Sequence, residues 1–567
     1  MLVNKMIKNN LFCKLIIFLF AIFVPFVSCK SSQIEQEDNH IYTEDDSLND
    51  EISAIRKIGK TENVKALWRI FLLRERLKSE NKFNQSVEDF YNECVENCVK
   101  EFNSFVQPEN QEKSADYFAA LRIFRSFEAL GLDKESELFI KSENLQNKIY
   151  GFVPKLKYRE ENKVEMSDMI KGTVTVYVDK GIKVENGSGY LDSVLGSGFF
   201  ITSDGYLITN YHVISDMVEK KYEGYSRLYI KLAEDPETRI PAKVVGYDAT
   251  LDLALLKTEI EAPYVFILGS SNELQVGDKV FAIGSPLGLE KTLTSGIISS
   301  TDRNLFTVGH VFQLDAAVNS GNSGGPLIDE TGKVQAVVFA GVPNYQGLNF
   351  AIPIEYLKIE LPFLFNGGER NQVWIGAYGK TKRLPGSGTS NEGILINYVM
   401  NGGNSARAGL NQNDTIVKIN NQTVASLDDL QLIFMHYQEG TIVRLEVKDE
   451  NDLIKNLFVY LEKRPENPGY EIYQRDNIEN AMFPLLGIKL VSTSTFNKRK
   501  FNVTEVLKGS SADEAGFSEN DPIEILGIEF NKDKTAGIVQ LYVKRRKKGY
   551  LDIGISLPLT VDSPYYF

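Results

Sequence analysis

Three residue types that together can make a serine nucleophile stand in separate segments of the sequence. His212 lies in the segment TNYHV, Asp252 begins the segment DLALL, and Ser323 lies in GNSGGPL. A serine hydroxyl is a weak nucleophile at neutral pH, so it needs an imidazole to accept its proton and a carboxylate to hold that imidazole in one tautomer. The sequence therefore predicts acyl-transfer chemistry, with Ser323 as nucleophile, His212 as general base and Asp252 as the residue that orients the histidine.

The glycines around the serine predict a second part of the same site. Glycine permits a sharp backbone path on which N–H groups can face a developing oxyanion. We expect Gly321 and Ser323 to donate these N–H groups, with Asn322 between them in the oxyanion loop. Loss of one such donor typically costs about 3 to 4 kcal/mol of transition-state stabilisation. The conformation of this loop alone could therefore switch activity on or off.

The elements that must position these residues are short strands. From about residue 165 to about residue 365 the sequence consists of β-rich runs separated by glycine turns, for example 173–178 and 199–202. Such spacing is typical of an all-β barrel or sandwich. The chain order histidine, aspartate, serine matches chymotrypsin-like double barrels rather than subtilisin or the α/β-hydrolases. We therefore expect residues 165–365 to form a double β-barrel.

The substrate pocket follows from the expected fold. In trypsin-like folds the floor of the primary pocket lies six residues before the nucleophile, which is Ala317 here, and a later strand with Val338, Phe339 and Ala340 forms the wall. The floor carries no carboxylate. A basic P1 side chain would be buried without a partner, at a cost of several kcal/mol, so we expect small or medium apolar P1 residues.

Two further units follow the β-rich block and resemble each other. The segment SARAGLNQNDTI (405–416) parallels SADEAGFSENDPI (511–523), which indicates an internal duplication. We expect PDZ-like α+β domains at 371–464 and 483–562.

Each of these units contains a segment that resembles the carboxylate-binding loop of PDZ domains. There, backbone N–H groups hold a chain terminus and a strand edge accepts the peptide by β-augmentation. Ser426–Asp429 is typical of a capping box that opens the helix beside the groove. The first module favours peptide binding over mere bracing of the protease, whereas for the second an oligomer contact is an equal alternative. The expected peptide-binding residues are Trp374, Ile375, Gly376, Leu486, Gly487 and Ile488.

The motifs as a set resemble one family. TNYHV, DLALL and GNSGGPL, with AIGSPLG (282–288) and TSGII (294–298), are similar to the HtrA/Deg family of trypsin-like serine proteases with two C-terminal PDZ domains. The resemblance covers about residues 165 to 560. It implies ATP-independent endoproteolysis of misfolded envelope proteins, binding of unfolded polypeptides and C-terminal peptides, and a homotrimer or a multiple of it. Two alternatives stay open: a chaperone or peptide-sensing scaffold with secondary or lost proteolysis, and a dedicated regulatory protease.

The amino-terminal segment has the pattern of an export signal. Three lysines precede an apolar run from Leu15 to Val27, which as a helix would rise only about 20 Å, short of the roughly 30 Å hydrocarbon core. The segment FVSC resembles a bacterial lipobox. We expect a lipoprotein-type signal peptide at 1–28, lipid attachment at Cys29, a disordered tether at 29–50 and a place on the periplasmic face of a bacterial membrane; an uncleaved anchor is the alternative.

Between the tether and the β-rich block, apolar residues recur at helical spacing. We expect three to five packed helices within 51–160, with one helix stopping at Gly131. The region is either a structural spacer or trimer-side appendage, or a partner-binding platform. Cys94 and Cys98 stand at i and i+4 on one helix face, either as an oxidised pair or as two core thiols.

Length, charge and the remaining motifs bound the other functions. The 567 residues suggest about three to five domains, and the formal net charge of −13 gives no electrostatic case for nucleic-acid binding. His40, His310 and His436 show no metal spacing, so we expect neither metal nor cofactor. The basic run 544–548 is expected near a helix end, as a solvated face or as a contact for anionic lipid or peptide.

Overall fold

The computed structural model describes residues 44–107, 115–134, 136, 138, 142–150, 165–185, 187–218, 227–284, 292–303, 309–318, 321–341, 348–383, 391–493, 499–546 and 550–567. The expected signal peptide, Cys29 and His40 lie outside these residues. The chain divides into two compact units, one ending at Glu101 and one beginning at Phe102. Within the described ranges, no helix is long and apolar enough to cross a membrane.

The first unit is helical. It contains helices α2 (Glu44–Ile58), α3 (Asn63–Ser79) and most of α4 (Gln85–Val106). The tether predicted to extend to residue 50 is too long, because α2 already begins at Glu44. Arg56 and Lys57 in the last turn suit the helix dipole.

The two cysteines of α4 are core thiols. Cys94 and Cys98 are both free and buried, so of the two alternatives the structure has the core thiols. Burial raises the pKa of the Cys94 thiol to about 12. Both thiols therefore act as small hydrophobic side chains in this helix.

Two more helices belong to the second unit. Helix α5 (Tyr117–Leu130) ends at Gly131 in the left-handed conformation, which confirms the predicted stop, and α6 (Ser142–Tyr150) packs beside it. Helix α5 packs on strand β19 (Ile442–Lys448), where the Ser126 hydroxyl accepts the Ile442 N–H at 2.9 Å. Helices α5 and α6 thus make their contacts within the second unit, whereas α2, α3 and most of α4 lie in the first. Helical spacing identifies an apolar face but not the element that will cover it.

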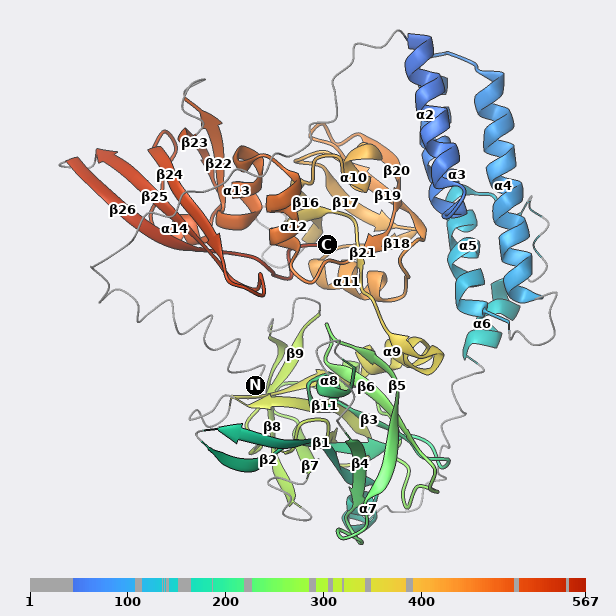
Figure 1. Ribbon diagram of the computed structural model, residues 1–567, viewed down its shortest axis with the longest axis vertical. Coiled ribbons are helices and arrows are strands. Elements are labelled where there is room, and N and C mark those ends of the chain that lie inside the picture. The colour runs from blue at the N-terminus through green and yellow to red at the C-terminus, as the bar shows by residue number, and fades with distance from the viewer. Residues whose placement is uncertain are drawn as a thin grey trace. The chain divides into compact units, whose positions relative to one another are not determined.

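The second unit continues with a closed β-barrel (Figure 1). Its strands follow the order β5-β4-β1-β2-β3-β6, and pairing of β5 with β6 closes the ring. Short helices α7 (Met166–Lys171) and α8 (Tyr211–Val218) flank it. The strands are β1 (Thr173–Glu185), β2 (Ser188–Phe200), β3 (Tyr206–Thr209), β4 (Arg227–Leu232), β5 (Ile240–Asp248) and β6 (Leu253–Thr258).

A second closed barrel follows, in the order β10-β11-β12-β9-β8-β7. Helix α9 (Ile354–Asn366) and β13 (Gly368–Glu369), which pairs with β5, lead out of it. The predicted chymotrypsin-like double barrel is confirmed. The strands are β7 (Lys279–Gly284), β8 (Thr292–Arg303), β9 (Val311–Leu314), β10 (Pro326–Ile328), β11 (Val334–Gly341) and β12 (Asn349–Pro353), with a 3₁₀ turn at Ser271–Glu273 before them.

The first PDZ domain has a six-stranded sheet in the order β15-β16-β17-β19-β20, with β18 paired to β17, so β15 is an edge strand. The capping box predicted at Ser426 and Asp429 is present at the start of α11. The elements are β14 (Val373–Trp374), β15 (Ala377–Arg383), β16 (Asn391–Val399), α10 (Asn404–Arg407), β17 (Thr415–Ile419), β18 (Gln422–Thr423), α11 (Leu427–Met435), β20 (Ile454–Tyr460) and β21 (Glu462–Lys463).

The second PDZ domain has a sheet in sequential order, β22 to β26. The basic run expected near a helix end instead begins within β25, because Val539, Leu541 and Val543 alternate into the core with the period of a strand. Between β24 and β25 the chain makes a turn over 531–536, without a helix like α11. The elements are α12 (Pro468–Arg475), α13 (Ile478–Leu486), β22 (Ile488–Ser492), β23 (Lys500–Val506), α14 (Ser511–Glu514), β24 (Pro522–Phe530), β25 (Gly537–Arg546) and β26 (Tyr550–Leu559).

Candidate active site

The three residues expected to form a triad come from both barrels. His212 lies in the first turn of α8, Asp252 directly precedes β6, and Ser323 lies in the loop before β10. The first barrel therefore supplies His212 and Asp252, and the second supplies Ser323.

The histidine and the aspartate form a two-point contact. The His212 Nδ1 atom lies 2.7 Å from Asp252 Oδ2, and the His212 backbone N–H donates to Oδ1 at 2.8 Å. Asp252 is buried and has a φ of +58°, and the Asn210 side-chain amide donates to its carbonyl at 2.8 Å. Both carboxylate oxygens are thus used to fix the imidazole, which presents its Nε2 atom away from the carboxylate.

The serine hydroxyl has a different partner. Ser323 Oγ donates to the carbonyl of Phe339 at 3.1 Å, and within the described residues it makes no hydrogen bond with His212. Rotation about one side-chain bond changes the direction of this hydroxyl, and such rotamers interconvert readily. Catalytic hydrogen bonds are often incomplete until substrate is bound.

The loop that carries Ser323 is held by Ser197 at the end of β2. The Ser197 N–H donates to the Ser323 carbonyl at 2.7 Å, and the Ser197 hydroxyl donates to the Gly321 carbonyl at 2.6 Å. In the described part of the chain, the N–H groups of Gly321 and Ser323 donate to no acceptor. Asn322, which was expected between the two N–H donors of the oxyanion loop, has its side chain buried beside Gly284.

Ser197 is a positioning residue that sequence reasoning missed. Its only signal is its place between two glycines. Gly324 permits the close approach of the two barrels, because a Cβ atom on this residue, whose φ is +87°, would lie 2.2 Å from the Ser197 carbonyl. A Cβ atom on Gly196 would lie 2.5 Å from the Val213 side chain. The segments GSG (196–198) and GNSGG (321–325) therefore contact each other across the two barrels.

The residues expected to line the substrate pocket occupy different environments. Ala317 is exposed, and its carbonyl accepts the Thr294 hydroxyl. The Val338 side chain packs in the core of the second barrel, while its backbone pairs with Gly324 and Gly325. The Phe339 ring is buried against Phe350, and Ala340 lies in β11. The predicted floor and wall thus flank the nucleophile loop.

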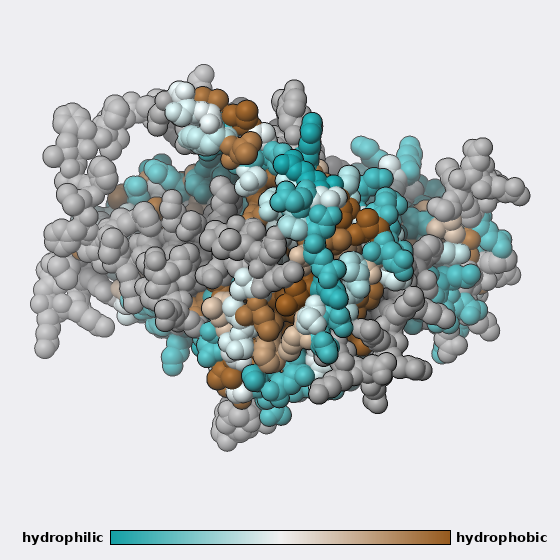
Figure 2. Space-filling model, turned by 90° about the horizontal axis from the view of Figure 1, so that it is seen from below, coloured by the Kyte–Doolittle hydropathy of each residue, from teal (hydrophilic) through white to brown (hydrophobic). Residues whose placement is uncertain are grey.

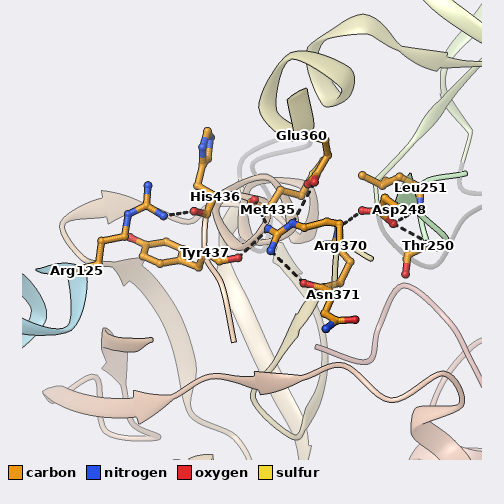
Figure 3. Close-up of polar contacts among 11 residues, drawn as sticks. Arg125, Asp248, Thr250, Leu251, Glu360, Arg370, Asn371, Met435, His436 and Tyr437 are labelled. Carbon is orange, nitrogen blue, oxygen red and sulfur yellow. Dashed lines mark hydrogen bonds and ion pairs between the residues drawn. The ribbon is translucent and has the colours of Figure 1, made fainter. Parts of the chain in front are cut away.

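The connection between protease and first PDZ domain is a buried polar network around Arg370 (Figure 3). Its guanidinium donates to Glu360 of α9 at 3.1 Å and to the carbonyls of Met435 and Tyr437 at 2.8 Å each. Burial raises the pKa of Glu360 to about 7. One cation thus ties the end of α11 to the protease domain.

The same linker reaches the loop before the catalytic aspartate. The Gln372 side-chain amide donates to Asp248, whose other oxygen accepts the N–H groups of Thr250 and Leu251. These two residues directly precede Asp252. Sequence reasoning missed this network, because nothing local marks Arg370 or Asp248 as partners.

The two predicted peptide-binding loops differ. In the first, Ile375 is buried in the core of its domain, Trp374 is buried against the core of the second PDZ domain, and Gly376 has a φ of +77°. In the second, the Gly487 N–H is used to end α13, where Leu486 is the last residue and Ile488 begins β22. A helix that would form the other wall of a groove is absent from the described chain between β24 and β25.

Metal ligation has no candidate here. The described residues contain no group of three or more histidine, cysteine, aspartate or glutamate side chains that could hold a metal ion. His310 instead pairs through Nδ1 with the Tyr356 hydroxyl at 2.8 Å, and burial lowers its pKa.

Four family models match successive parts of the chain. Residues 46–149 match a domain of unknown function (DUF8517), 196–337 a trypsin-like peptidase domain, 374–448 a PDZ domain and 469–561 the TP0546 family PDZ domain. The order agrees with the helical region, double barrel and two PDZ domains described above.

Curated relatives extend over several of these domains. A probable periplasmic serine endoprotease, DegP-like, from Chlamydia trachomatis is 32% identical over 377 residues, which cover 63% of this chain and 71% of the relative. A protein of the same description from Bartonella henselae is 36% identical over 344 residues, which cover 58% of this chain and 65% of the relative. A solved structure of the HtrA-type protease AlgW with a decapeptide is 27% identical, with a TM-score of 0.44, and covers 53% of this chain and 97% of that one. The chain belongs to the HtrA family of DegP-like serine endoproteases, with a trypsin-like peptidase domain followed by two PDZ domains.

Proposed function

We propose that this protein is an ATP-independent endopeptidase of the cell envelope that degrades misfolded or damaged exported proteins. The observation that carries the proposal is the His212–Asp252 pair at 2.7 Å, beside a serine loop with two available N–H groups. The names of the relatives, which describe periplasmic serine endoproteases, support a periplasmic location. The amino-terminal pattern supports export with a lipid on Cys29.

The catalytic cycle follows from the positions of these groups. The Ser323 hydroxyl turns from Phe339 toward His212, which takes its proton as the oxygen attacks the peptide carbonyl. The N–H groups of Gly321 and Ser323 stabilise the oxyanion, and the imidazolium is stabilised by Asp252. His212 then gives the proton to the leaving amine, and water releases the acyl group by the same steps in reverse.

The substrates are polypeptides with accessible apolar segments. The exposed floor residue Ala317 and the buried ring of Phe339 offer no charge, which supports small or medium apolar P1 residues. Cleavage-site mapping on a denatured protein should give cuts mainly after such residues, and dominant cuts after lysine or arginine would contradict the pocket assignment.

Assembly is the second part of the proposal. The β1–β2 hairpin exposes Ile182, Val184 and Leu191, at 71%, 68% and 80% of their surface. Hydrophobic residues also reach the surface in patches among hydrophilic ones on the face drawn in Figure 2. Exposed apolar residues on one hairpin support contacts with other chains, either in a homotrimer or with unfolded clients.

A serine-reactive fluorophosphonate tests the enzyme assignment. We expect it to label Ser323, with no labelling and no casein degradation in the variant Ser323→Ala. Unfolded-client protection that survives in Ser323→Ala, together with absent casein degradation in the parent, would instead favour the chaperone or scaffold function.

A dedicated regulatory protease is the second candidate, and the Ser323–Phe339 hydrogen bond favours it, because the nucleophile is not yet engaged with its base. Such an enzyme would cut one envelope protein after a signal. A proteome-wide cleavage profile separates the two functions: many unrelated cleaved proteins indicate quality control, and a single cleaved protein indicates regulation.

A further inference from the structure

In the first PDZ domain, helix α11 lies beside the edge strand β15, where the Leu427 N–H donates to the Thr381 hydroxyl at 3.0 Å; the site between these two elements is called the groove below. One edge of β15 pairs with β16, and its other edge would be open in an isolated sheet. An open edge with an adjacent apolar helix is the arrangement that accepts an extended peptide as an added strand.

In this structure the groove is filled by the last residues of the sequence, Pro564–Phe567. The Ala377 N–H donates to the Phe567 carbonyl at 2.9 Å, and the Phe567 N–H donates back to the Ala377 carbonyl at 3.0 Å. The Gly379 N–H donates to the Tyr565 carbonyl at 3.1 Å, and Tyr378 and Tyr566 form an antiparallel bridge. The segment is therefore an added antiparallel strand in register with β15.

The side chain of Phe567 occupies the apolar part of the groove. It is 3% exposed and belongs to the core cluster of the first PDZ domain, with Ile375 from the predicted binding loop and Leu430 and Phe434 from α11. Its ring lies 3.1 Å from the position that a Cβ atom would take on Gly379. The last side chain is thus enclosed by the groove as an aromatic anchor.

The flanking residues hold the segment at several further points. The Gln431 amide of α11 donates to the Pro564 carbonyl at 3.0 Å, and its oxygen accepts the Gly309 N–H of the protease domain at 2.7 Å. Tyr566 is buried in the core of the second PDZ domain, where its hydroxyl donates to the carbonyls of Pro484 and Thr560. Two successive side chains of the segment therefore contact different domains: Phe567 lies in the core of the first PDZ domain and Tyr566 in the core of the second.

We propose that Pro564–Phe567 is a built-in ligand of the first PDZ domain, and that an extended peptide with a large aromatic residue at the position that Phe567 occupies binds only by displacing it. This proposal rests on the proposed peptide recognition. A ligand tethered in the same chain competes at an effective concentration on the order of millimolar. A free peptide should consequently bind with an affinity reduced by the small fraction of open grooves.

Two measurements on the full chain, in the Ser323→Ala background, test the proposal. The first is fluorescence anisotropy with an amino-terminally labelled hexapeptide of the sequence DSPYYF. The second is hydrogen–deuterium exchange at the amides of Ala377 and Gly379, which donate to the tail segment. The test variant is Phe567→Ala, and the matched control is Ile553→Ala, which truncates an exposed apolar side chain of β26.

We expect Phe567→Ala to lower the Kd of the peptide at least about tenfold, as expected when a millimolar competitor is weakened. The amides of Ala377 and Gly379 should exchange faster, while those of β19 stay protected, which shows that the domain is still folded. Ile553→Ala should change neither quantity.

The remaining outcomes overturn the proposal in distinguishable ways. Unchanged exchange in Phe567→Ala means that the groove is not held by this segment. Faster exchange without peptide binding in either protein means that the segment is only a brace between domains, and it removes peptide recognition from the proposed function as well. Equal peptide affinity in both proteins means that the segment does not compete.

Discussion

Replacement of Arg370 should release the first PDZ domain from the protease domain. The variant Arg370→Met keeps an unbranched apolar stem but removes the guanidinium. Arg370 is 8% exposed and Glu360 is fully buried, so no solvent can replace the lost donors. Four acceptors then lose a partner at once: the carboxyl group of Glu360 and the carbonyls of Asn371, Met435 and Tyr437.

The expected cost is about 3 to 5 kcal/mol, which is the usual effect of removing one partner from a buried ion pair. The burial that already raises the pKa of Glu360 to about 7 allows the carboxyl group to become neutral, which limits the loss to this range. Because about 1.4 kcal/mol is a factor of ten, the equilibrium for opening the linker should rise roughly 100- to 4,000-fold.

Native-state hydrogen exchange measures this opening directly. The Arg370 N–H donates to the Tyr247 carbonyl and the Arg464 N–H donates to the Gln372 carbonyl, so these amides report whether the linker is seated. The matched control is Arg407→Met, which removes an exposed guanidinium from α10 and should change exchange less than threefold. The double variant Arg370→Met with Glu360→Gln should recover part of the loss, since no buried charge remains.

A loss of protection below tenfold in Arg370→Met would refute the reasoning. So would an equal loss in Arg407→Met, because the effect would then follow from the charge of the whole chain rather than from the buried network.

Three other predictions follow from the site and the linker. Asp252→Asn leaves one acceptor oxygen for the two His212 N–H groups, so kcat for a peptide substrate should fall about 10⁴-fold while thermal unfolding stays nearly unchanged; a loss below tenfold would contradict the two-point contact. Gly324→Ala places a methyl group 2.2 Å from the Ser197 carbonyl, so fluorophosphonate labelling of Ser323 should slow at least about 100-fold. The control is Gly332→Ala, which also replaces a glycine with a positive φ and should keep the labelling rate. Because burial raises the pKa of Glu360 to about 7, its contribution to the free energy of unfolding is fully present below about pH 4.5 and is lost as the pH rises through about 7. Calorimetry of Ser323→Ala between pH 5 and 8 should therefore show a stability that falls with rising pH. The added substitution Glu360→Gln should make the stability nearly independent of pH in this range.

The sequence predicts the architecture well where a feature is determined by residues that are close together in the chain. The short strands, the capping box at Ser426 and the helix stop at Gly131 depend on residues within a few positions of each other. It fails where the partner is distant. The apolar face of α5 is evident, but its packing on β19 depends on residues more than 300 positions away, as the contact of Ser126 with Ile442 illustrates.

The same distinction holds at the site. Chemistry identifies His212, Asp252 and Ser323 from their residue types and motifs, and the structure brings the first two within 2.7 Å. It does not identify Ser197, Arg370 or Gln431, whose roles come from acceptors in other domains. The aromatic residues at 565–567 are plain in the sequence, yet only the pairing with β15 makes them a ligand.

One physical constraint explains why the orientation of Ser323 could not be read from the sequence. The nucleophile loop is fixed by hydrogen bonds from Ser197, which belongs to the other barrel, so its conformation depends on how closely the barrels meet. Within that loop the Ser323 hydroxyl donates to the Phe339 carbonyl at 3.1 Å, a partner on β11 that lies 16 positions along the chain. No local pattern around Ser323 predicts this partner, because only the folding of the second barrel brings β11 beside the loop.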